Sequence, residues 1–173
     1  MSLLKNYLEL TKPKVVSMML ITAIVGMLLA TPNIPSFQIM IIALLGIGLC
    51  AASAATINQI IDRNIDAGMQ RTSGRPLPQG EVSLVNASLF ALFLMIMGTI
   101  ILIYFVNTLT ALLTICSLVG YAFIYTVFLK RATPQNIVIG GLAGAAPPLL
   151  GWTAITTSID PNDLLLVLII YVW

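Results

Sequence analysis

Long apolar segments separated by short polar ones dominate the sequence. Residues 15–61, 82–129 and 132–159 contain no Asp, Glu, Lys or Arg. A helix needs about 20 apolar residues to cross the hydrocarbon core of a bilayer. Each of the two longer segments is therefore long enough for two membrane spans and a short reversal, and the third is long enough for one.

Turn-forming residues divide these segments into individual helices. Pro32 and Pro35 mark a reversal after the first span, and Asn107 begins another. We expect complete spans at residues 15–30, 37–61 and 84–106, a fourth that ends at Leu129, a fifth at 137–157, and the start of a sixth near Leu164. The helix of the second span is expected to continue into Asp62 and Asp66. The sixth has about half the length that a bilayer requires, so we expect a C-terminally incomplete chain. The predicted fold is all-α, a single polytopic transmembrane helix-bundle domain over residues 1–173.

Composition agrees with this pattern. Hydrophobic residues make up 59% and charged residues 8% of the sequence, whereas soluble domains contain about 25% charged residues. A soluble protein of this composition would expose large apolar patches and aggregate. We therefore expect the lipid bilayer, and no nucleic acid, as a partner. Cys50 and Cys116 fall inside apolar spans, which indicates core side chains rather than a disulfide.

The basic residues all fall on one side of the predicted topology. They form three clusters, before the first span, after the second and after the fourth: Lys5, Lys12, Lys14, Arg63, Arg71, Arg75, Lys130 and Arg131. The positive-inside rule makes this side, and with it the N-terminus, cytoplasmic. Asp160 and Asp163 then lie on the opposite side, where we interpret them as polar loop residues.

The fifth predicted span contains small residues and two prolines. Gly140 and Gly144 form a G-x-x-x-G pattern, which lets another helix approach closely. Pro147 and Pro148 remove two backbone donors and are expected to kink or break the helix. Helix packing is the simpler interpretation, and a break that shapes a central cavity is the alternative.

The polar residues at the end of the second span form the main candidate site. Asn58, Asp62 and Asp66 are spaced four apart, so on a helix they form one stripe with about 6 Å between neighbours. Acidic residues near a helix C-terminus oppose the helix dipole, and like charges four apart repel each other. A bound cation offsets both effects, and oxygen ligands favour Mg²⁺. We predict that these three residues are catalytic and bind magnesium; a charge cluster that merely ends the helix is the alternative.

Basic residues on the same side complete a phosphate site. Arg71 and Arg75 closely follow the acidic stripe, and Lys130 and Arg131 follow the fourth span. The planar fork of arginine and the point charge of lysine both suit phosphate oxygens. We predict that these four residues bind a metal-bridged phosphate, and contact with anionic lipid is the alternative for each one singly.

A phosphate site beside an apolar bundle favours an amphiphilic substrate such as a prenyl diphosphate. Magnesium would neutralise the diphosphate leaving group while the bundle holds the hydrocarbon tail away from water. Tyr121 and Tyr125, near the end of the fourth span, are candidates for stabilising an allylic cation. The alternative for both is a core or interfacial role.

At these residues the chain resembles the UbiA-type intramembrane prenyltransferases. Their first aspartate-rich motif, N-x-x-x-D-x-x-x-D, matches Asn58, Asp62 and Asp66. Residues 75–78, 125–136 and 140–152 narrow the resemblance to the branch of the family that farnesylates protohaem IX. The resemblance covers nearly the whole chain, from Leu10 onward.

The resemblance implies a reaction and a larger fold. A farnesyl group passes from farnesyl diphosphate to a vinyl group of protohaem IX, giving haem O for terminal oxidases, whose assembly proteins are expected partners. The fold is a bundle of about nine helices in a bacterial inner membrane. The stripe binds Mg²⁺ and the diphosphate, assisted by Arg71, Arg75, Lys130 and Arg131. The family's second aspartate-rich motif and a histidine-containing segment are absent from this sequence, so we expect this segment alone to be inactive.

Two alternatives remain open. A related prenyltransferase acting on a quinone precursor or chlorophyllide is the nearer one. The other is a cation carrier or channel that uses Asp62 and Asp66 as its ion site, which predicts metal-dependent flux without consumption of farnesyl diphosphate.

Overall fold

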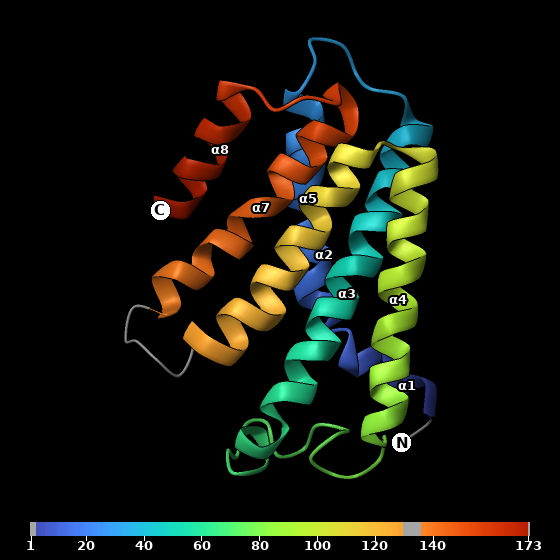
Figure 1. Cartoon of the computed structure of the whole chain (residues 1–173), viewed down its shortest axis with the longest axis vertical. Coiled ribbons are helices and arrows are strands. Elements are labelled where there is room, and N and C mark those ends of the chain that lie inside the picture. The colour runs from blue at the N-terminus through green and yellow to red at the C-terminus, as the bar shows by residue number, and fades with distance from the viewer. Residues whose placement is uncertain (1–2, 130–135, 173) are drawn as a thin grey trace.

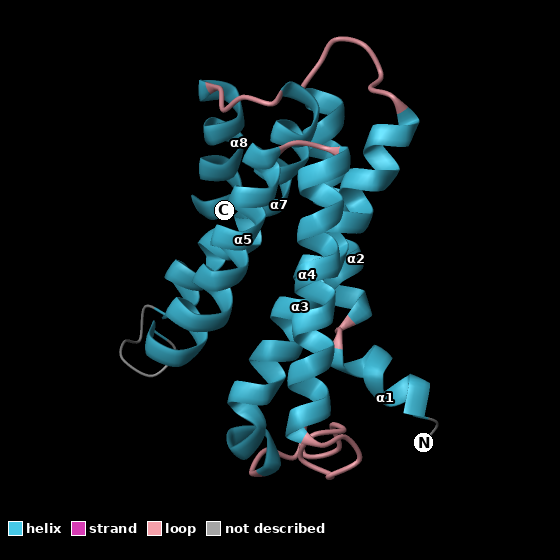
Figure 2. Cartoon of the chain, turned by 45° about the vertical axis from the view of Figure 1, so that its right-hand side comes forward, coloured by secondary structure: helices cyan, strands magenta, loops and turns pink. Residues whose placement is uncertain are grey.

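The computed structural model of the chain describes residues 3–129 and 136–172, and in this part it consists of helices and their connections, without a strand (Figures 1 and 2). The elements are α1 (Leu3–Leu10), α2 (Pro13–Leu29), α3 (Phe37–Ala67), α4 (Leu84–Phe105), α5 (Thr108–Val119), the π-helix η1 (Gly120–Leu129), α7 (Asn136–Thr156) and α8 (Pro161–Val172). The predicted all-α class is confirmed.

The helices begin and end close to the predicted spans. α3 continues beyond its apolar part to Ala67, so the predicted acidic stripe lies on one unbroken helix. η1 follows α5 directly and ends at Leu129, the predicted end of the fourth span. α8 begins at Pro161, earlier than predicted, because proline is well suited to the first position of a helix.

The described helices are suited to a membrane. α3 and α4 are each long and apolar enough to cross a bilayer, and α1 with α2, bent by 47° at their junction, forms a third candidate span within the described residues. The molecule is therefore a multi-pass membrane helix bundle.

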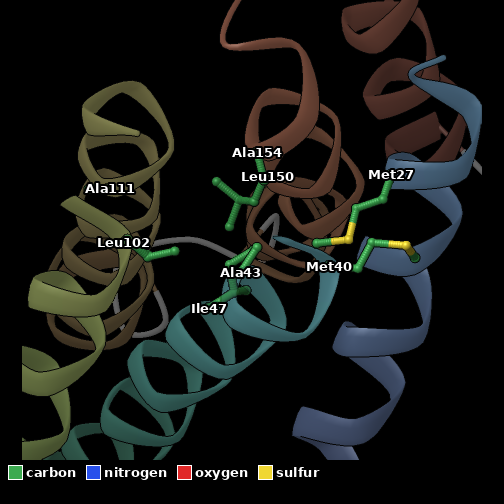
Figure 3. Close-up of a cluster of buried hydrophobic side chains, with 8 residues drawn as sticks. All are labelled: Met27, Met40, Ala43, Ile47, Leu102, Ala111, Leu150 and Ala154. Atoms are coloured by element: carbon green, nitrogen blue, oxygen red, sulfur yellow. The ribbon is translucent and has the colours of Figure 1, made fainter. Parts of the chain in front are cut away.

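Two ends of the bundle differ in character. α1 and the loop at residues 68–83 lie at one end, and the reversals that follow α2, α4 and α7 lie at the other (Figures 1 and 2). An apolar core joins five helices near the latter end (Figure 3); its buried members are Met27, Met40, Ala43, Ile47, Leu102, Ala111, Leu150 and Ala154. This core fixes the bundle and leaves the end with the polar loop to carry the functional residues.

α2 and α7 touch through their backbones. A Cβ atom on Gly26 would collide with the backbone of Pro148, and one on Gly151 would collide with the backbone of Ala23. α7 runs through Pro147 and Pro148 as one helix. The alternative of a broken helix is therefore wrong, because α2 packs against α7 at this point and supports it.

The glycine pair Gly140 and Gly144 does not mediate such a contact. A Cβ on Gly140 would lie 2.5 Å from Cε2 of Tyr125, whereas one on Gly144 would have no atom within 4 Å. Both glycines line a cavity. The predicted close approach of another helix is confirmed at Gly140, where Tyr125 of η1 packs, but not at Gly144, beside which the described residues leave space.

Asp160 and Asp163 are part of a helix start. Asp163 is completely buried, and its Oδ2 accepts the backbone N–H of Asp160 at 3.1 Å. Oδ2 of Asp160 accepts the indole N–H of Trp152 at 3.4 Å. The interpretation as polar loop residues is therefore wrong for Asp163, whose carboxylate satisfies a free N–H at the start of α8.

Candidate functional site

The acidic stripe lies on the last turns of α3. Asn58, Asp62 and Asp66 are all buried, although each is polar. The amide Nδ2 of Asn58 donates to Oδ2 of Asp62 at 3.0 Å, across one helical turn. Because buried carboxylates are costly without compensating partners, their position at the polar end of the bundle indicates a site that offers positive charge.

Arg75 provides such charge to the far end of the stripe. Its Nη1 lies 2.5 Å from Oδ2 of Asp66. The loop that carries Arg75 is ordered by its own contacts: the hydroxyl of Thr72 donates to the carbonyl of Asp66 at 3.0 Å, and Pro76 is fully buried. The loop thus brings one of the predicted arginines to the stripe.

The other predicted phosphate ligands do not join this cluster in the described structure. Arg71 is exposed and, within the described part of the chain, makes no hydrogen bond or ion pair with the stripe. Lys130 and Arg131 lie outside the described residues. Their predicted role stays a prediction.

Lys12 is a site residue that the sequence alone did not identify, since it was assigned only to topology. Its Nζ donates to Oδ1 of Asn58 at 2.5 Å, and the side chain is half-buried. It occupies the junction of α1 and α2, where its backbone is left-handed, with φ 49° and ψ 60°. The following Pro13 disfavours a helical conformation at Lys12 and so signals a bend, but the signal does not indicate what the side chain faces.

η1 contributes a second residue that the sequence did not identify. Thr126 is completely buried and lies 3.4 Å from Nδ2 of Asn58, whose N–H it accepts. Its own hydroxyl donates to the carbonyl of Tyr121 at 2.8 Å. The threonine therefore orients the Asn58 amide, so that Oδ1 faces Lys12 and Nδ2 faces Asp62. π-Helical segments are rare and occur often at functional sites.

The two predicted tyrosines stack on each other. The ring centroids of Tyr121 and Tyr125 are 5.6 Å apart, with an angle of 16° between the ring planes. Tyr121 lines the cavity, and the ring of Tyr125 packs on Gly140. The structure thus places the pair beside the cavity and leaves its role in stabilising a cation as a prediction.

The cavity itself lies between α2, α3, α5, η1 and α7 and has a volume of about 230 Å³. Its lining is mainly small and apolar, with Ala54, Gly144 and Pro147 as examples, while Lys12 and Tyr121 are among its few polar members. Because Lys12 also binds Asn58, the cavity and the stripe are adjacent. A polar site beside an apolar compartment suits a ligand with a charged head and a hydrocarbon tail.

The oxygen atoms of the stripe suit a hard cation that receives some of its ligands from the protein and the others from water or a substrate. No three His, Cys, Asp or Glu side chains come together within residues 3–129 and 136–172. The stripe offers two carboxylates and one amide oxygen. Mg²⁺ commonly takes one or two carboxylates and completes its shell with water and substrate phosphates, so these residues fit a magnesium ion shared with a phosphate ligand.

Solved structures share this fold. The digeranylgeranylglyceryl phosphate synthase structure superposes with a TM-score of 0.86 at 24% identity, over 99% of this chain and 59% of that chain. A UbiA homologue from Archaeoglobus fulgidus bound to DMAPP and Mg²⁺ superposes with a TM-score of 0.80 at 22% identity, over 96% of this chain and 60% of that chain.

Curated relatives are closer in sequence. Protoheme IX farnesyltransferase 2 of Pseudoalteromonas atlantica is 60% identical over 169 residues, which is 98% of this chain and 55% of that protein. Protoheme IX farnesyltransferase of Legionella pneumophila is also 60% identical, over 98% of this chain and 58% of that protein. The chain thus spans little more than half the length of these relatives. The model of the UbiA prenyltransferase family matches residues 19–173, and the chain belongs to that family.

Proposed function

We propose that the protein containing this chain transfers a farnesyl group from farnesyl diphosphate to a vinyl group of protohaem IX, giving haem O. The observation that carries the proposal is the adjacency of an acidic stripe, two cationic side chains and an apolar cavity. The relatives named protoheme IX farnesyltransferase, at 60% identity, support protohaem as the acceptor.

The diphosphate head lies at the stripe in this proposal. Lys12 and Arg75 turn from Asn58 and Asp66 toward the phosphate oxygens, since both cations suit phosphate. Asn58, Asp62 and Asp66 hold Mg²⁺, which supplies charge neutralisation to the departing diphosphate. The two carboxylates alone would repel the diphosphate, so the cation site and the phosphate site act together.

The farnesyl tail lies in the cavity, whose apolar lining keeps water from the reacting carbon. The stacked pair Tyr121 and Tyr125 offers ring faces beside it, which stabilise developing positive charge.

Arg71, Lys130 and Arg131 are proposed as further contacts to the diphosphate. The alternative of a cation carrier is less well supported, because an apolar cavity offers an ion no polar path.

The protein is proposed to lie in the bacterial inner membrane with a cytoplasmic N-terminus and five complete spans in this chain, as part of a larger bundle. α1, which carries Lys5, and the loop at residues 68–83, which carries Arg71 and Arg75, share one end of the bundle (Figure 1). That arrangement supports placing this end, with the stripe, at the cytoplasmic surface. Terminal oxidase assembly proteins are proposed partners of the haem O product.

Acceptor choice tests the proposal. Membranes containing the full-length protein are supplied with farnesyl diphosphate and either protohaem IX, a hydroxybenzoate quinone precursor or chlorophyllide, and the products are identified by mass spectrometry. We expect a farnesylated haem and no prenylated benzoate or chlorophyllide. Prenylation of either other acceptor with protohaem unchanged would assign the protein to the alternative branch.

A further inference from the structure

The backbone of Lys12 is held in an uncommon conformation. A left-handed φ is disfavoured for residues with a side chain, and persists where the surrounding structure requires it. Lys12 adopts φ 49° at the junction where α1 and α2 bend by 47°. The same residue sends its ammonium group to the site.

Gln59 of α3 supplies the main contacts. Its Nε2 donates to the carbonyl of Glu9 at 3.0 Å and to that of Leu10 at 3.1 Å. The hydroxyl of Thr56, one turn earlier, donates to the carbonyl of Ala52 at 2.9 Å and lies 3.5 Å from the Leu10 carbonyl. Carbonyls at a helix C-terminus have no helical partner, so the buried Gln59 amide fastens the end of α1 to α3.

Adjacent residues of α3 therefore hold both ends of Lys12. Gln59 fixes the backbone that leads into Lys12, and Asn58 receives its Nζ at 2.5 Å. Gln59 is 2% exposed and Leu10 is fully buried, so water does not readily replace these hydrogen bonds. The positions of Asn58 and Gln59 on α3 thus determine where the ammonium group of Lys12 lies relative to Asp62.

We propose that Gln59 is a positioning residue, which holds the junction of α1 and α2 so that Lys12 reaches the diphosphate of the substrate. The inference rests on the proposed function, in which Lys12 binds that diphosphate. An amide is suited to the task because it donates to two carbonyls and carries no charge. A glutamate of the same size would direct a carboxylate oxygen at those carbonyls.

A double-mutant cycle between Gln59→Leu and Lys12→Met tests the proposal in the full-length protein in detergent. The measured quantity is the Kd of radiolabelled farnesyl diphosphate in the presence of Mg²⁺. Each single change is expected to weaken binding about tenfold, the size of a lost charge-assisted contact. The double variant is expected to bind no more weakly than Lys12→Met alone, because Gln59 acts through Lys12.

Ser53→Ala is the matched control. Ser53 is also buried on α3 and donates to a backbone carbonyl, that of Ala91 on α4, at 2.7 Å. Its loss is expected to lower thermal stability and leave the Kd unchanged. Hydrogen exchange reports the junction directly: Gln59→Leu is expected to speed exchange of the Thr11 and Lys12 amides, and Ser53→Ala is not. Should Gln59→Leu fail to fold, Gln59→Asn, which keeps the amide but shortens its reach, takes its place in the cycle.

The outcomes distinguish failure of the positioning role of Gln59 from failure of the proposed contact between Lys12 and the diphosphate. Independent, multiplicative losses in the double variant, or an unchanged Kd in the Gln59 variant, would overturn the positioning role. An unchanged Kd in Lys12→Met, with Gln59→Leu still weakening binding, would instead remove Lys12 from the proposed diphosphate site.

Discussion

Arg75 and Asp66 form an ion pair in which Nη1 of the arginine lies 2.5 Å from Oδ2 of the aspartate. The two residues belong to different parts of the proposed site, since the carboxylate is suited to a metal and the guanidinium to phosphate. The pair must therefore open when the substrate binds. Until then, each partner compensates the burial of the other.

Arg75→Ala is expected to raise the KM for farnesyl diphosphate about tenfold or more, because a charge-assisted contact is lost, with a much smaller change for protohaem. The arginine side chain is 27% exposed but Asp66 is buried, so the stability lost with the ion pair is expected to lie between that of a surface pair and that of a fully buried one, about 1–3 kcal/mol. Steady-state kinetics with each substrate varied in turn checks both statements.

Arg63→Ala is the control for this prediction. Arg63 also lies near the end of α3, but within the described residues its Nε donates to the neighbouring Asn64. Its loss is expected to leave both KM values unchanged. Equal effects of the two substitutions would indicate that general surface charge, rather than a specific phosphate contact, is responsible.

Gly144→Leu tests the role of the cavity. A Cβ at Gly144 meets no atom within 4 Å, and the residue lines the cavity, so a leucine enters this space without a clash near the backbone. We expect the folded protein to favour geranyl diphosphate over farnesyl diphosphate, measured as the ratio of their kcat/KM values. Gly144→Ala is expected to give a smaller shift in the same direction. An unchanged ratio for Gly144→Leu would place the tail elsewhere.

Gly151→Ala is expected to destabilise the bundle by about 1–3 kcal/mol, the usual range for overpacking. An added Cβ collides with the backbone of Ala23 on α2, which cannot rotate away as a side chain does. Thermal unfolding in detergent checks this prediction, with Gly144→Ala as the matched substitution on the same helix. Equal melting temperatures for the two variants would contradict the close contact of α2 and α7.

Hydropathy and spacing were sufficient to predict the helices and the stripe. The end of an uncharged segment predicted where η1 ends, because burying charge in a bilayer is costly, and Asn107 predicted the reversal that follows α4. The four-residue spacing of Asn58, Asp62 and Asp66 predicted a common face, because one helical turn brings such residues together. Both inferences depend only on neighbours within one helix.

Contacts between helices were not predictable in the same way. Lys12 lies 46 positions before Asn58, and its approach depends on a left-handed junction that Gln59 holds. Asp163 was interpreted as a loop residue because its burial depends on how α8 packs, and the sequence does not show that packing. In each case the sequence contains the residue type, while its partner is determined by tertiary packing.

The central claim is that the stripe supports magnesium-dependent farnesyl transfer. The most direct measurement is haem O formation by the full-length protein in membranes, with Asp62→Asn and Asp66→Asn compared with the unchanged protein across a range of Mg²⁺ concentrations. We expect haem O from the unchanged protein only when Mg²⁺ is present, and none from either variant, although both insert into the membrane normally. Near-normal haem O formation by either variant, or formation that does not depend on Mg²⁺, would contradict this account.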